Sequence, residues 1–237
     1  MSDKIMKLKH VIRLFKPVYF IRSLIFFKQF VGSNKLFFDI GANLGNRTGI
    51  FTHLGVKVVA VEPQPFCADQ LEKKFKGREV MIVRKGIGRE AGEMKMSVCD
   101  NNTGISTFSE KWKTGRFKNF KFDREILVQM TTLDALIMEF GQPDFCKIDV
   151  EGFELEVISG LNKKIGCLNF EFTSEFFDNS KKCIEKLVSI GFKEFNFTLG
   201  ETPKFILDSW TDKARLFATL EKRIKSNQDL WGDVYAK

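Results

Sequence analysis

The chain of 237 residues contains only two histidines and five cysteines, and this scarcity excludes several kinds of site. No two cysteines are spaced as C-x-x-C, and an odd number cannot all be paired in disulfides, so we expect free thiols in a reducing compartment, the cytoplasm. A metal centre built from histidines needs more than His10 and His53 can supply. A hydrolase with a catalytic histidine would have to use one of these two residues.

The chain also lacks a basic character that extends over its whole length. Its net charge is +8, but residues 1–35 contain eight Lys or Arg and one acid, Asp3, so they carry +7 and leave about +1 for the rest. We therefore expect no nucleic-acid partner. No apolar stretch reaches the roughly 18–20 residues that span a bilayer, and no uncharged core with a cleavage site for a signal peptide is present.

Basic and large apolar residues are mixed in residues 4–31, and Pro17 is expected to divide this segment into two short helices. In one interpretation both helices pack on the core and cover the site. In the other, the segment is a basic amphipathic surface that lies on an anionic membrane, so that the protein is peripheral at the inner membrane surface. We assign residues 1–32 to this helical extension and residues 33–237 to one globular domain.

Strand and helix patterns alternate from residue 33 onward. Strands are predicted at 36–40, 57–62, 79–84, 145–150, 167–173, 192–199 and 231–236, and helices at 46–54, 65–76, 132–140, 151–160, 179–190 and 211–226. This alternation predicts an α/β fold with a doubly wound, mostly parallel seven-stranded sheet and helices on both faces. Residues 86–126 break the alternation. There we expect a strand near 93–99 and a mobile insert at 100–125, either a functional lid or a solvated basic loop.

The most informative stretch reads FFDIGANLGNRTGIFTHLGVKVVAVE, residues 37–62. Its pattern predicts a strand that ends in Asp39, a glycine turn, a short helix and a second strand that ends in Glu62, which is the first half of a nucleotide-binding fold. Gly41 and Gly45 allow backbone angles and a close approach of ligand that a Cβ would block. The carboxylate of Glu62 should lie at the carboxyl end of its strand, where it can bind a ribose diol.

The ligand expected at this turn is S-adenosylmethionine. A pyrophosphate fingerprint starting at Gly41 would need glycines at positions 43 and 46, which are Asn43 and Asn46. Asp39 would repel a diphosphate but suits the ammonium group of S-adenosylmethionine, directly or through water, while Glu62 holds the ribose. The alternatives are a nicotinamide-dependent oxidoreductase on a similar fold, or an ordinary βαβ unit whose glycines only form a tight turn.

Seven residues are therefore predicted to bind the donor. Those of the first turn and second strand contact the methionine portion and the ribose, and those after the third strand lie on the adenine side: Asp39, Gly41, Asn43, Gly45, Glu62, Gly86 and Ile87. In a doubly wound sheet these positions meet at the carboxyl ends of the strands.

A second segment, DFCKIDVEGFELEVISGL at residues 144–161, places Asp149 and Glu151 near the carboxyl end of another buried strand. That end lies beside the donor turn in a doubly wound sheet. We predict that Asp149 or Glu151 orients an acceptor hydroxyl or takes its proton, which requires a pKa raised by burial or by a neighbouring acid. We also expect both to tolerate amide substitution without loss of stability. The alternative is that Glu151 and Glu154 are only helix-start acids favoured by the helix dipole.

Carboxylates are also the only plentiful candidates for metal ligands. Five of them could offer oxygen atoms to Mg²⁺: Asp134, Asp149, Glu151, Glu154 and Glu171. Their positions suit strand ends and helix starts, and we predict no metal.

Four motifs together resemble the FkbM-type methyltransferases: the turn at 39–45, Val-Glu-Pro at 61–63, Thr-Leu-Asp at 132–134 and KIDVEGFE at 147–154. The resemblance covers about residues 34–172 and extends loosely towards the C-terminus. It implies a class I methyltransferase-like (Rossmann-like) fold, S-adenosylmethionine as donor, and a hydroxyl acceptor on a sugar, glycolipid or polyketide. It does not extend to the N-terminal segment, which leaves a third hypothesis, a non-catalytic membrane-surface protein on a methyltransferase core.

Overall fold

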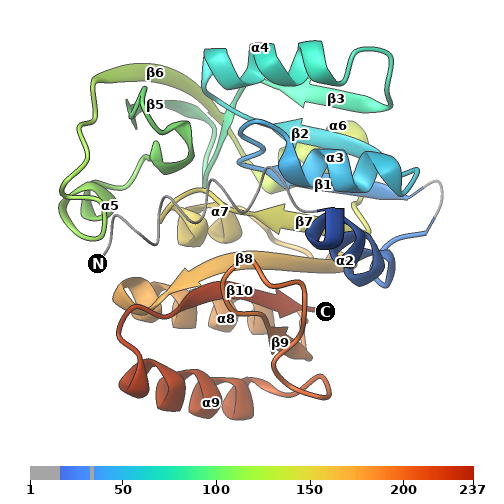
Figure 1. Cartoon of the computed structure of the whole chain (residues 1–237), viewed down its shortest axis with the longest axis vertical. Coiled ribbons are helices and arrows are strands. Elements are labelled where there is room, and N and C mark those ends of the chain that lie inside the picture. The colour runs from blue at the N-terminus through green and yellow to red at the C-terminus, as the bar shows by residue number, and fades with distance from the viewer. Residues whose placement is uncertain (1–16, 33–34) are drawn as a thin grey trace.

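A seven-stranded sheet forms the centre of the computed structural model, which describes residues 17–32 and 35–237 (Figure 1). The strand order is β3-β2-β1-β7-β8-β10-β9. Neighbouring strands are parallel except where β10 pairs with β8 and β9. The strands are β1 Leu36–Ile40, β2 Lys57–Val61, β3 Val80–Val83, β7 Phe145–Ile148, β8 Cys167–Thr173, β9 Phe195–Phe197 and β10 Trp231–Ala236. The predicted fold class is confirmed, and β9 is shorter than the predicted strand at 192–199.

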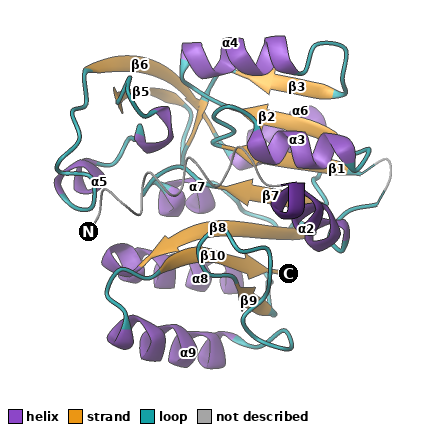
Figure 2. Cartoon of the chain, viewed as in Figure 1, coloured by secondary structure: helices purple, strands orange, loops and turns teal. Residues whose placement is uncertain are grey.

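Helices cover both faces of this sheet (Figure 2). Alternate side chains of β1 face opposite ways, so Phe37 joins one apolar core and Phe38 the other. The first core is covered by α2 Pro17–Lys28, α3 Asn46–His53 and α4 Pro65–Lys74. The second is covered by α6 Leu133–Phe140, α7 Glu154–Ser159, α8 Phe177–Ser189 and α9 Lys213–Ser226.

Several helices begin where their sequence signals predict. Pro65 opens α4 at a position where its missing N–H is not needed. The Thr132 side chain caps α6 by accepting from the Ala135 N–H, at 3.1 Å. Pro17 likewise stands at the start of α2, while the other predicted short helix lies outside the described residues. No helix in the described part of the chain is both long and apolar enough to cross a membrane.

A second sheet of three strands, in the order β4-β6-β5, stands beside the first. It contains β4 Gly86–Ile87, β5 Gly92–Val98 and β6 Arg124–Thr131. The strand predicted near 93–99 is confirmed as β5, but β6 was not predicted. Its signal was present in the sequence, because buried Val128 and Met130 alternate with exposed Leu127 and Gln129.

Residues 99–123, which connect β5 to β6, fold into a small unit that we call the cap. It contains the 3₁₀ helix η1 Thr103–Ile105 and the helix α5 Glu110–Thr114. Four buried side chains, Cys99, Ile105, Trp112 and Phe117, form its own apolar core. Because Trp112 and Phe117 are each only 2% exposed, the prediction of a solvated basic loop is wrong: the aromatic residues outweigh the lysines that surround them in the sequence.

Candidate functional site

A cleft that encloses about 760 Å³, open solvent at its mouth included, lies at the carboxyl ends of β1, β2 and β7. It brings together eight of the nine residues predicted from the sequence: Asp39, Gly41, Asn43, Glu62, Gly86, Ile87, Asp149 and Glu151. The ninth, Gly45, does not line it.

Asp39 is buried near the end of β1, and only one of its two carboxylate oxygens accepts hydrogen bonds from described residues. Its Oδ2 accepts hydrogen bonds from the Thr48 backbone N–H, at 2.9 Å, and from the Thr48 hydroxyl, at 2.6 Å. Its Oδ1 is buried and has no hydrogen-bond partner among the described residues. A buried carboxylate oxygen without a donor is costly, so this atom fits a ligand that brings a positively charged donor, such as an ammonium group.

Glu62 follows β2 directly and is only 2% exposed. Its Oε2 accepts from the Asn43 N–H at 2.8 Å, and its Oε1 accepts from the Gln64 N–H at 2.9 Å. Burial raises the pKa of Glu62 from 4.5 to about 7, although the two N–H groups favour the carboxylate. The carboxylate therefore links the turn after β1 to the turn after β2 on one side of the cleft. We call this the donor side because the methyl donor is predicted to bind there.

The two glycines of the first turn have the positive φ angles that were predicted, +79° at Gly41 and +74° at Gly45. Their close contacts are with the protein itself. A Cβ at Gly41 would lie 2.0 Å from the carbonyl oxygen of Asp149, and one at Gly45 would lie 2.5 Å from the ring of Phe75. Packing of β1 against β7 and α4, rather than the approach of a ligand, explains these two glycines. Asn43 also has a positive φ, +48°, a region that Asn enters more readily than most residues.

The cap closes the donor side through contacts that the sequence did not reveal. The Thr103 hydroxyl donates to Asn43 Oδ1 at 3.1 Å, and Gln64 Nε2 donates to the Thr103 carbonyl at 3.1 Å. Beside them Gly86 leaves no space for a Cβ, which would meet Met130 Sδ at 2.5 Å. Sequence analysis missed Thr103 and Gln64 because a lone polar residue in a loop carries no pattern.

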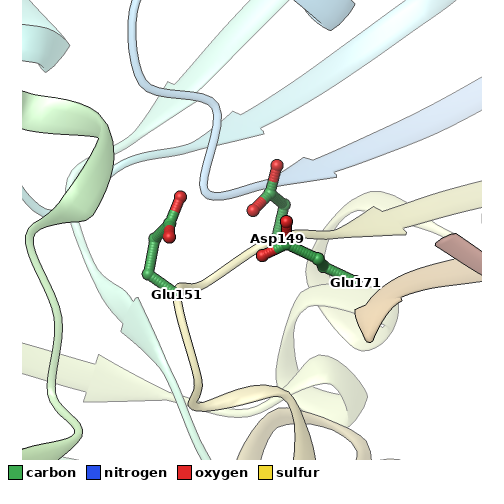
Figure 3. Close-up of side chains that lie close together, drawn as sticks. All are labelled: Asp149, Glu151 and Glu171. Atoms are coloured by element: carbon green, nitrogen blue, oxygen red, sulfur yellow. The ribbon is translucent and has the colours of Figure 1, made fainter. Parts of the chain in front are cut away.

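Three carboxylates meet at the other side of the cleft, which we call the acceptor side because the acceptor is predicted to bind there. Asp149 and Glu151 follow β7 and line the cleft, and Glu171 of β8 lies beside them (Figure 3). One oxygen from each lies within 4.8 Å of the others. Glu151 has a φ of +55°, and its carbonyl accepts from the hydroxyl of Thr107 in the cap at 2.7 Å. Such oxygens suit a hydroxyl proton or a divalent cation. The absence of a metal remains a prediction.

Lys147 holds Asp149 in place from the same strand. Its Nζ lies 2.8 Å from Asp149 Oδ2, and the two side chains are 5% and 19% exposed. Burial opposes the charge of Lys147, but the fields of Asp149 and Asp39 outweigh it and raise the pKa of the lysine. The expectation that Asp149→Asn leaves stability unchanged must therefore be corrected, because this substitution would leave a buried lysine without its counter-charge.

Glu154 supports the turn that carries Glu151. Its Oε1 accepts from the backbone N–H groups of Val150, at 3.1 Å, and Gly152, at 3.2 Å. Burial, together with the charge of Glu171, raises the pKa of Glu154 to about 8. These contacts agree with the interpretation of Glu154 as a residue that organises the start of α7. Asp134, the fifth acid considered, accepts from Asn162 instead.

Arg47 is a further residue of the cleft that sequence analysis did not select. It lines the cleft from α3 and is 9% exposed. Its guanidinium donates to the Tyr19 hydroxyl of α2 at 2.8 Å and to Glu201 Oε2 at 3.1 Å. The cleft is thus tied to the N-terminal helix and to the loop after β9.

Residues 39–207 match the model of the methyltransferase FkbM domain, and the chain belongs to this family. Methyltransferase sdnD from Sordaria araneosa is 26% identical over 165 residues, which cover 56% of this chain and 62% of that protein. Hexuronic acid methyltransferase AglP from Haloferax volcanii is 25% identical over 159 residues, which cover 64% of this chain and 60% of that protein. The chain therefore spans about three-fifths of the length of these curated relatives.

Two solved structures align over most of the chain. The precorrin-6y C5,15-methyltransferase from Geobacter metallireducens gives a TM-score of 0.48 at 14% identity and covers 91% of this chain and 87% of its own. A TehB-like SAM-dependent methyltransferase from Corynebacterium glutamicum gives 0.49 at 12% identity and covers 98% and 95%. The family assignment rests on the sequence match and not on these alignments.

Proposed function

We propose that the protein is an S-adenosylmethionine-dependent O-methyltransferase that methylates a hydroxyl on a sugar, glycolipid or polyketide-like acceptor. The observation that carries the proposal is the cleft lined by Asp39, whose Oδ1 has no hydrogen-bond partner among the described residues, and Glu62 on one side, and by Asp149 and Glu151 on the other, with Glu171 close behind these two acids. Family membership supports methyl transfer as the reaction. The relative named for a hexuronic acid places sugars first among the acceptors to be tried.

Each group of the donor has a matching residue in the cleft. Asp39 Oδ1 accepts from the ammonium group, and Glu62 accepts from the ribose hydroxyls. The guanidinium of Arg47 offers a positive charge to the donor carboxylate, and Gly86 with Ile87 bounds the adenine side. When bound, S-adenosylmethionine supplies a methyl group on a positively charged sulfur.

The acids after β7 act on the acceptor. Asp149, held by Lys147, would orient the acceptor hydroxyl. Glu151 would take its proton as the oxygen attacks the donor methyl carbon from roughly 3–3.5 Å, and the bond from that carbon to sulfur would break with S-adenosylhomocysteine as the leaving group. Glu171 places a further negative charge beside both.

Isothermal titration with S-adenosylmethionine tests the donor site. We expect Glu62→Ala to weaken the Kd about tenfold or more, because charge-assisted hydrogen bonds to the ribose are lost. Glu79→Ala, at an exposed acid before β3, is the matched control and should bind like the parent. No heat from the folded parent, or equal Kd values for the parent and Glu62→Ala, would contradict the donor assignment.

Transfer of a labelled methyl group into a panel of glycans, glycolipids and polyketides tests the reaction. We expect a labelled product from one acceptor class, with equal rates in the presence and absence of EDTA. Loss of activity with EDTA, restored by Mg²⁺, would show that the carboxylates hold a cation and that the prediction of no metal is wrong. Donor binding without transfer to any acceptor would favour the non-catalytic alternative.

A further inference from the structure

The helix α2 carries apolar side chains on two faces, one buried against the core and the other exposed to solvent. Three aliphatic side chains point to solvent: Val18 is 57% exposed, Ile21 is 53% exposed and Ile25 is 70% exposed. With 3.6 residues per turn, these positions and exposed Arg22 and Lys28 fall within an arc of about 120°. An arc of this width is typical of the side that an amphipathic helix buries. In α2 this side is exposed, and the side with Phe26 and Phe27 is buried.

That opposite side fixes α2 firmly to the sheet. Phe26 and Phe27 are 8% and 2% exposed and belong to the first apolar core. The ring of Phe27 packs against those of Phe51 and Phe145, with centroids 5.2 Å and 5.9 Å apart. The exposed aliphatic face is therefore presented in a fixed orientation, and turning the helix to bury it would remove two phenylalanines from the core.

The charged residues of α2 itself are of one sign. Arg22 and Lys28 are exposed on α2, and residues 1–35 carry +7 of a total net charge of +8. The rest of the chain is nearly neutral. Positive charge is thus concentrated in the sequence around the exposed aliphatic face.

We propose that α2 docks on an anionic lipid bilayer. Val18, Ile21 and Ile25 enter the boundary between headgroups and acyl chains, while Arg22 and Lys28 contact the negatively charged headgroups. Three aliphatic side chains fall well short of the roughly 800 Å² that each partner contributes to a stable protein interface, and this face of α2 carries no aromatic anchor. A bilayer accepts such a shallow apolar surface without matching its shape.

This docking surface goes beyond the proposed function and does not depend on it. Tyr19 on the same helix bonds Arg47, which lines the cleft. The docked helix and the cleft would therefore be close, which suits an acceptor attached to a lipid.

Co-sedimentation of the full chain with vesicles tests the proposal. Vesicles of phosphatidylcholine mixed with phosphatidylglycerol should pellet the protein, and vesicles of phosphatidylcholine alone should leave most of it in solution. Binding should weaken as salt is raised, because the attraction between lysines and lipid headgroups is screened.

Three sets of variants separate the apolar and the electrostatic contributions. The triple variant Val18→Ser, Ile21→Ser, Ile25→Ser should reduce binding to the anionic vesicles about tenfold or more. Arg22→Glu with Lys28→Glu should reduce it by a similar factor. The control is Leu127→Ser with Met138→Ser, which removes aliphatic side chains that are 64% and 88% exposed elsewhere, and it should bind like the parent. Equal melting temperatures and equal S-adenosylmethionine affinities should show that every variant is folded.

Three results would overturn the proposal. The first is parent protein that binds neither kind of vesicle, and the second is a triple variant that binds as well as the parent. The third is a parent that is dimeric in light scattering and becomes monomeric in the triple variant, because the occupant of the face would then be a second copy of the chain.

Discussion

The donor side and the acceptor side of the cleft are built in different ways. On the donor side, Asp39 contacts Thr48, nine residues away, and Glu62 contacts Asn43, 19 residues away, within one continuous strand–helix–strand unit. On the acceptor side, the Thr107 hydroxyl reaches across 44 residues to the carbonyl of Glu151, and Glu171 comes from a separate strand. The two acids of the donor side are thus held within one local motif, although Thr103 of the cap closes that side from a distance in sequence, whereas the acids of the acceptor side depend on how distant segments pack.

The two sides nevertheless contact each other where Gly41 passes the carbonyl oxygen of Asp149. Gly41→Ala should therefore cause the largest loss of all, more than about 4 kcal/mol of unfolding free energy, because a Cβ placed 2.0 Å from that oxygen forces β1 and β7 apart. Gly55→Ala is the matched control, since Gly55 has a φ of +72° but no atom within 4 Å of its Cβ position. It should lose only about 1–2 kcal/mol. If urea unfolding gave equal losses of unfolding free energy for Gly41→Ala and Gly55→Ala, the close contact between Gly41 and Asp149 would not contribute to stability.

The acids of the acceptor side should separate catalysis from stability. Glu151→Gln should lower the rate of methyl transfer about 100-fold or more, with a change in unfolding free energy within about 0.5 kcal/mol. Asp149→Asn should lower activity too, but should also lose on the order of 3 kcal/mol, because Lys147 stays buried without its partner. Asp178→Asn, at an exposed acid in the first turn of α8, is the control for both measurements. Full activity in both Glu151→Gln and Asp149→Asn would show that these acids have a structural and not a catalytic role.

The donor side should respond to pH through Glu62. Because its pKa is raised from 4.5 to about 7, its contribution to stability is complete below pH 4.5 and is lost as the pH rises through about 7. Donor affinity should change in the opposite direction, since ribose hydroxyls bond best to the carboxylate. Between about pH 5.5 and 7.5 we expect the affinity to rise about tenfold in calorimetric titrations. Glu62→Gln should remove this rise, and an unchanged pH dependence in that variant would assign it to another group.

The smallest effect is expected where the cap touches the donor side. Thr103→Val removes the hydroxyl that donates to Asn43 but leaves the bond from Gln64 to the backbone carbonyl. A single neutral hydrogen bond contributes about 1 kcal/mol, so the donor Kd should rise about fivefold at most. Thr114→Val, whose hydroxyl bonds only within α5, should leave it unchanged. If Thr103→Val and Thr114→Val raised the donor Kd equally, the hydrogen bond from Thr103 to Asn43 would have no specific part in donor binding, and the cap would matter only by being folded.

The sequence predicted where the residues of the donor side lie because its signals are local. Glycines, an acid at each strand end and Pro65 at a helix start depend on neighbours within a few residues. The sequence predicted that Glu171 lies on a strand, but it did not predict that the Glu171 carboxylate lies close to that of Asp149. Cys146 pairs with Leu168 and Ile148 with Phe170, and this register, continued by one residue, sets Asp149 beside Glu171. No pattern in either segment alone contains that register.

By itself, the sequence determined the order of the strands in the main sheet and of most helices, the place of Asp39 and Glu62 at strand ends, and the family. It did so because backbone preferences and the alternation of apolar residues act over short distances. Only the tertiary structure decided that Gly41 is required by a neighbouring strand, that Lys147 neutralises Asp149, and that α2 presents an aliphatic face to solvent. Each of these depends on which surfaces are buried together, and burial is a property of the whole packed chain rather than of any segment of it.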